Sequence, residues 1–222
     1  MTRNIVDLTL PIQEGMQTFP VHWHPMVEIS QLGRIGVEER VTRKLVLGTH
    51  TGTHMDAPSH FIADGKGLDD IPLSQLVGPA HVMDFSDAKP FQELCIDAFE
   101  ERLKDVTPER VLMRFDWSDN YNTPIYYSDH PFISEKAAQW LVDRGCKLLA
   151  MDTPMPDNPA NGRGTCNDSP NHKILLGNDV VLVEYLTNTR SLTKPVVELV
   201  VAPLKIVEGD GSPVRCFAIE QD

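Results

Sequence analysis

The 222-residue sequence lacks any apolar run close to the roughly 20 residues that a transmembrane helix requires. Its first residues also lack the apolar core of a signal peptide. The four cysteines are widely spaced and form no C-x-x-C pair, which argues against disulfides. We therefore expect a cytoplasmic protein that does not associate with membranes.

Basic residues are also scarce, since 20 Lys and Arg stand against 32 Asp and Glu and give a formal charge of -12. Nucleic-acid binding requires clustered Lys and Arg to neutralise phosphates, so the composition argues against a nucleic-acid partner. Internal repeats, low-complexity tracts and Gly/Ser linkers are absent, and 41% of the residues are hydrophobic. The sequence predicts a single globular domain over residues 1–222.

The cysteines differ in their surroundings. Cys146 lies in an apolar stretch and Cys216 in a strand pattern, so both are predicted core residues. Cys166 lies in the polar stretch 162–168, which could border a site. A nucleophilic role for Cys166 is disfavoured because only Arg163 stands nearby to lower the pKa of its thiol.

Residues 50–60 contain three of the chain's 8 histidines and one aspartate, namely His50, His54, Asp56 and His60. Imidazole and carboxylate ligands together suit Zn or a neighbouring first-row metal, and a set of three leaves a coordination position open for chemistry. No Glu follows His50, so the segment is not an H-E-x-x-H helix. Glycine, proline and threonine disfavour a helix, and we expect an irregular loop after a strand that ends at residue 47.

The remaining pattern alternates strands with helices and predicts an α/β fold with a mixed sheet. A helix is predicted over 96–103, and a second over 134–142 with Ser134 as its N-cap and Gly145 as its stop. Residues 171–176 could be a short helix or a loop. The predicted strands are 5–10, 26–31, 37–47, 80–85, 110–115, 147–151, 180–185 and 196–206.

Two ionisable residues stand on either side of the turn at 177–179. Glu184 lies within the apolar strand 180–185, and His172 precedes the turn. Burying an unpaired carboxylate is costly, so Glu184 points either to a bound cation or to a hydrogen-bond network. Taken alone, both residues could equally face solvent or be structurally paired.

Residues 50–60 match the pattern H-x-G-T-H-x-D-x-P-x-H, which resembles the cyclase superfamily of metal-dependent hydrolases. That family includes bacterial arylformamidase (kynurenine formamidase) and isatin hydrolase. Residues 7–9, 130–138 and 151–157 look like further segments of the family. The resemblance implies a compact, barrel-like α/β sandwich that assembles as homodimers or homotetramers.

The resemblance also implies the roles of the site residues. His50, His54 and Asp56 would bind a first metal, and Asp56 would bridge to a second metal held by His172 and Glu184. His60 would act as the catalytic proton shuttle. The cofactor would be a divalent metal, Zn or Mn, with one or two ions per subunit.

One part of the N-terminal loop departs from the family. Arylformamidases carry a Trp before a Pro-Gly-Asp turn that packs on the aromatic substrate, whereas here Phe19 precedes Pro20 and Trp23 lies downstream. We expect Phe19 and Trp23 to contact the substrate. His22 and His24 in the same loop are expected to face water, with substrate contact or adventitious metal binding as alternatives.

The implied reaction is hydrolysis of a non-peptide carbon–nitrogen bond in a small aromatic or cyclic amide. A divalent metal lowers the pKa of bound water toward roughly 7 and polarises the carbonyl, and His60 would return a proton to the leaving nitrogen. The alternatives are a lactone hydrolase or ring-forming cyclase on the same site, and a metal-binding protein without turnover.

Overall fold

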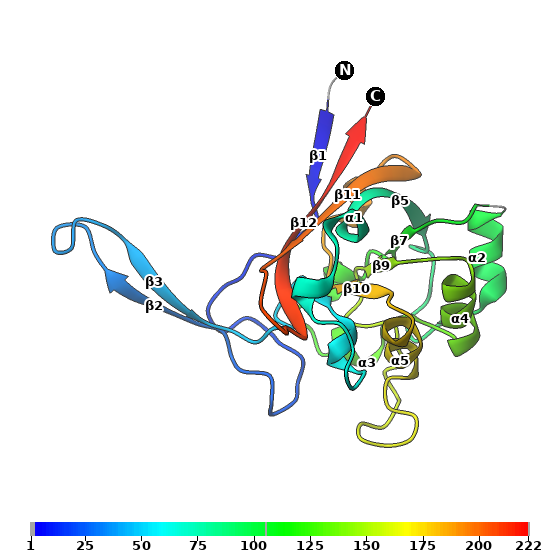
Figure 1. The fold of residues 1–222 in the computed structure, drawn as a ribbon, viewed down its shortest axis with the longest axis horizontal. Coiled ribbons are helices and arrows are strands. Elements are labelled where there is room, and N and C mark those ends of the chain that lie inside the picture. The colour runs from blue at the N-terminus through cyan, green and yellow to red at the C-terminus, as the bar shows by residue number, and fades with distance from the viewer. Residues whose placement is uncertain (1–2, 105, 222) are drawn as a thin grey trace.

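The structure is a computed structural model that describes residues 3–104 and 106–221 (Figure 1). Its helices are α1 (Leu73–Leu76), α2 (Ile96–Leu103), α3 (Ile125–Ser128), α4 (Glu135–Asp143) and α5 (Pro170–Gly177). Its strands are β1 (Arg3–Asp7), β2 (Glu28–Gly33), β3 (Thr42–Val46), β4 (His54–Asp56), β5 (Val77–Asp84), β6 (Glu93–Leu94), β7 (Arg110–Arg114), β8 (Phe132–Ile133), β9 (Leu148–Met151), β10 (Val181–Glu184), β11 (Val196–Pro203) and β12 (Gly211–Gln221).

The main sheet closes on itself. Its strand order is β1-β12-β11-β5-β7-β9-β10-β4, and β4 also pairs with β12, so seven strands form a ring with β1 attached outside it. Strands β5, β7, β9 and β10 run parallel to their neighbours in that series, whereas the remaining pairings are antiparallel. The predicted α/β fold with a mixed, barrel-like sheet is therefore confirmed.

The parallel strands are buried on both faces, as their continuous apolar sequences require. Along β9, Leu149 and Met151 belong to a core that also contains residues of the helices α2, α4 and α5. The alternate residues Leu148 and Ala150 belong to a second core, which is formed largely by residues of the barrel strands. The sheet therefore holds a rigid frame from which loops and strand ends can present polar groups.

Local signals set most element boundaries. The helix α4 begins after Ser134, whose side-chain oxygen accepts a hydrogen bond from the backbone N–H of Ala137, as an N-cap does. The stretch left open between helix and loop is helical, because α5 covers it. The strand predicted over 5–10 ends at Asp7, and beyond it Thr9 forms only an isolated bridge with Leu186.

The strands β2 and β3 form a separate two-stranded hairpin that projects far from the barrel (Figure 1). The strand predicted over 37–47 is shorter than expected, because residues 35–40 form the turn of this hairpin, with Gly36 at φ +85° and Glu39 at φ +57°. No helix among the described residues has the length and apolar character needed to cross a membrane.

Candidate metal centre

The short strand β4 carries two of the predicted ligands. The expectation of an irregular loop is wrong for His54 and Asp56, because β4 pairs with β10 on one side and with β12 on the other. Alternation along the strand buries Met55 in the barrel core and turns the flanking His54 and Asp56 to the opposite face. His50 lies in a turn before β4, and His60 ends the short 3-10 helix Pro58–His60.

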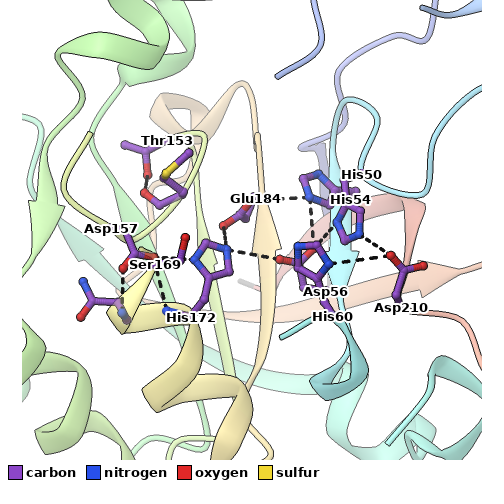
Figure 2. Close-up of polar contacts among 12 residues, drawn as sticks. His50, His54, Asp56, His60, Thr153, Asp157, Ser169, His172, Glu184 and Asp210 are labelled. Atoms are coloured by element: carbon purple, nitrogen blue, oxygen red, sulfur yellow. Dashed lines mark hydrogen bonds and ion pairs between the residues drawn. The ribbon is translucent and has the colours of Figure 1, made fainter. Parts of the chain in front are cut away.

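Two later segments bring their residues to the same face (Figure 2). Glu184 on β10 is the register partner of His54, and their Oε2 and Nε2 atoms lie 3.5 Å apart. The helix α5 presents His172, whose Nε2 lies 3.3 Å from Oε1 of Glu184 and 3.5 Å from Oδ2 of Asp56. The structure therefore brings together all five residues that were expected to hold metal.

Two of these imidazoles are oriented by partners outside the cluster. Nδ1 of His54 lies 2.8 Å from the carbonyl oxygen of Gly52, and Nδ1 of His172 lies 2.5 Å from Oδ2 of Asp157. Each Nδ1 donates to an oxygen that can only accept, which leaves Nε2 of each ring as the atom with a free lone pair. Such outer partners are a regular feature of histidine metal ligands.

Asp210 is a site residue that the sequence did not indicate. Its Oδ2 lies 2.8 Å from Nε2 of His50 and 3.8 Å from Nδ1 of His60, while Nδ1 of His50 lies 2.7 Å from Oδ1 of Asp56. The only signal near Asp210 is the following Gly211, where a Cβ would lie 2.6 Å from Cε1 of His50. Asp210 thus gives His50 the same kind of outer partner that Asp157 gives His172.

The carboxylates of this cluster fit a bound cation. Asp56 is 1% exposed and Glu184 is 3% exposed, and Oε1 of Glu184 is buried without a hydrogen-bond partner among the described residues. Burial and the negative charge of Asp56 raise the pKa of Glu184. Two buried carboxylates beside neutral imidazole nitrogens are the donor set of a first-row divalent metal.

The potential ligand atoms fall into two groups that share Asp56. One group is His54, Asp56 and Glu184, and the other is His50, Asp56 and His60, with the atoms of each group within 4.8 Å of one another. This grouping differs from the one that the resemblance implies, because it sets His50 with His60 and His54 with Glu184. Asp56 is the shared member in both arrangements.

The cluster lines a cavity of about 350 Å³, and Phe19 and Trp23 also line it. His24 does so too and is half-buried, so the expectation that it faces water is wrong, while His22 is exposed. Burial and the neighbouring His50 lower the pKa of His24 to about 4.

The cysteines lie where the sequence predicted. Cys146 and Cys216 are buried core residues. Cys166 is exposed, on a loop whose residues Arg163 and Gly164 line the cavity.

Known proteins match this chain over most of its length. A family model described as "Putative cyclase" matches residues 6–158. A kynurenine formamidase of Bacillus cytotoxicus is 29% identical over 216 residues, covering 96% of this chain and 95% of the relative. A kynurenine formamidase of Salinibacter ruber is 36% identical over 172 residues, covering 77% of this chain and 76% of the relative.

Solved structures share the fold. Isatin hydrolase A from Labrenzia aggregata superposes with a TM-score of 0.88 at 26% identity, covering 99% of this chain and 94% of that one. A structure described as a potential metal-dependent hydrolase with cyclase activity superposes with a TM-score of 0.78 at 26% identity and covers both chains completely. Each of these proteins is similar to this chain over nearly its full length.

Metal uptake is expected to release protons. Burial alone would lower the pKa of His50, but Asp56 and Asp210 outweigh it and raise that pKa to about 10 in the metal-free protein. At pH 8 His50 therefore carries a proton that an incoming ion must displace, so metal affinity should rise with pH toward that value. The heat of Mn²⁺ binding, measured by calorimetry in two buffers of different ionisation enthalpy, should differ between the buffers.

The Asp210→Asn variant supplies the comparison for this measurement. Removing the Asp210 charge lowers the pKa of His50, so fewer protons should be released at pH 8 and the difference between the buffers should shrink. Equal heats in both buffers for the unmodified protein would contradict the assignment of a protonated His50.

Proposed function

Because the chain belongs to the cyclase family, we propose that it is a metal-dependent hydrolase that cleaves a non-peptide carbon–nitrogen bond in a small aromatic or cyclic amide. The observation that carries the proposal is the pair of buried carboxylates, Asp56 and Glu184, with Nε2 of His54 and His172 turned toward them in one cavity. A cluster of this kind is costly without a cation to balance it. The names of the relatives, kynurenine formamidase and isatin hydrolase, support the choice of an amide.

His50, His54, Asp56, His172 and Glu184 would hold the metal, which we propose is Zn or Mn. The sharing of Asp56 between two groups of ligand atoms supports two neighbouring ions bridged by its carboxylate. When bound, a divalent metal lowers the pKa of water toward about 7 and polarises the carbonyl under attack. Asp157 and Asp210 would keep the ligating rings in position.

His60 would move the proton that this reaction requires. Its side chain is 26% exposed, whereas those of His50, His54 and His172 are between 3% and 8% exposed, so His60 can reach both substrate and solvent. Its ring centroid lies 3.9 Å from that of His50, which places it beside the cluster. A nitrogen leaving group needs a proton as the bond breaks, and an imidazole can supply it near neutral pH.

The cavity walls support an aromatic substrate. Phe19, Trp23, Phe61 and Tyr185 line the cavity together with the metal cluster. The ring of Phe19 is fixed by its edge contact with Tyr127 at 5.3 Å between centroids and by the guanidinium of Arg163, 3.9 Å above the ring. A ring held in this way is a preorganised surface for a flat substrate.

Replacing His54 and His60 separately should distinguish a ligand from a proton carrier. His54→Ala should lose both metal and turnover, because a central ligand is gone. His60→Ala should keep its metal while kcat falls by about 10² to 10⁴, the usual contribution of general acid–base catalysis. Metal analysis and turnover of N-formylkynurenine, isatin and a simple lactone measure both effects, and His22→Ala serves as the control.

Parallel loss of metal and activity in His60→Ala would make His60 a ligand and require a different base. Turnover of the lactone alone, with neither amide hydrolysed, would replace amide hydrolysis by the lactone reaction. Full activity of the metal-free protein on all three compounds would contradict the proposed function as a whole.

Replacing the aromatic walls should affect substrate binding more than chemistry. Phe19→Ala and Trp23→Ala should each raise KM for the hydrolysed aryl amide with little change in kcat, because contacts that are equal in ground state and transition state contribute only to binding. Steady-state kinetics of both variants test this, with the exposed Phe91→Ala as a control. Unchanged KM in both variants would place the substrate elsewhere in the cavity.

A further inference from the structure

The hairpin formed by β2 and β3, here called the arm (residues 28–46), lacks a core of its own. Five of its apolar side chains are between 55% and 70% exposed, namely Leu32, Ile35, Val37, Val41 and Leu45. A two-stranded hairpin is marginally stable in water unless another surface covers it. An exposed apolar surface of this kind marks an interaction site.

The backbone of the arm points to the same conclusion. β2 and β3 pair only with each other among the described residues, so each strand keeps one edge that is free for pairing. The arm also extends away from the barrel instead of folding back on it (Figure 1). Natural proteins cover or blunt such edges, and an assembly partner is one way to do so.

The charge of the arm indicates what covers it. Arg34, Arg40, Arg43 and Lys44 lie on the arm, in a chain whose formal charge is -12. The body of another copy is therefore an acidic partner for a basic, apolar arm. Exchange of identical arms around a two-fold axis gives a closed dimer, because each copy both offers and receives an arm.

The chain also offers a surface of matching chemistry. The loop between β11 and β12 exposes Leu204 and Val207, which are 63% and 75% exposed. Glu208 follows in that loop, and its backbone N–H donates to Asp69 at 2.8 Å, which brings an acidic segment beside the apolar side chains. Apolar side chains with an acidic border complement the apolar and basic side chains of the arm.

We propose that the arm of one copy docks on the β11–β12 loop of a second copy, and that this exchange forms a homodimer. The docked arm would also steady the cavity, because the two segments at its base carry cavity residues. Trp23 and His24 lie before β2, and His50 lies after β3. The proposal concerns assembly and does not depend on the reaction that the site performs.

Light scattering coupled to size exclusion tests the proposal. The unmodified protein should show at least twice the 24.9 kDa mass of one chain. The double variant Ile35→Glu with Val37→Glu should elute as a monomer, since it places charges in the covered surface. Leu204→Glu with Val207→Glu should do the same from the receiving side, whereas the exposed Val106→Glu should leave the mass unchanged.

A crosslinking experiment locates the contact without relying on dissociation. In a Cys95→Ser, Cys166→Ser background, a chain with Ile35→Cys is mixed with a chain with Val207→Cys and oxidised. A disulfide between the two different chains is expected. A monomeric unmodified protein, or an arm variant that keeps its dimer mass and an unchanged circular dichroism spectrum, would overturn the proposal.

Discussion

The carboxylate of Asp56 is the group around which the site is built. It lies within 2.7 Å to 3.5 Å of nitrogens from three imidazoles, those of His50, His54 and His172. Burial would raise the pKa of Asp56, but the charges of His50 and His54 outweigh it and hold that pKa well below its usual range. The same negative charge raises the pKa of Glu184. A cation that binds at Asp56 and Glu184 removes this conflict between two buried carboxylates.

The barrel keeps these groups together through one short strand. β4 joins β10 to β12 and so completes the ring of strands, and its two outward side chains are His54 and Asp56. Closure of the sheet therefore places Glu184 of β10 beside His54 and places Asp210, just before β12, beside His50. The site depends on the closed fold, because its residues come from segments more than 100 positions apart in the sequence.

Patterns that are local in sequence predicted much of this arrangement. The N-cap Ser134 marked the helix α4, and apolar runs marked the parallel strands, because both signals act over a few residues. The cluster from His50 to His60 marked the metal centre by its density of ligands. The strand character of β4 could not be predicted, because its three residues form a strand only through pairing with two distant strands.

Asp210 escaped prediction for the same reason. It lies 160 positions from His50, in a stretch whose glycines are typical of a surface turn. The position of His24 in the cavity likewise depends on how the N-terminal loop packs against the barrel. The resemblance to a family supplied the link between the early cluster and His172 and Glu184, which sequence spacing alone left open.

The most direct test of the account is the thermal stability of Glu184→Gln with and without a divalent metal. If Glu184 is buried to hold a cation, the metal-free variant should be at least as stable as the metal-free unmodified protein, because one buried negative charge is gone. Added Zn²⁺ or Mn²⁺ should raise Tm of the unmodified protein and leave the variant nearly unchanged. A metal-free variant of clearly lower Tm that still gains the full increase with metal would contradict the account, since Glu184 would then be a structural hydrogen-bonding residue.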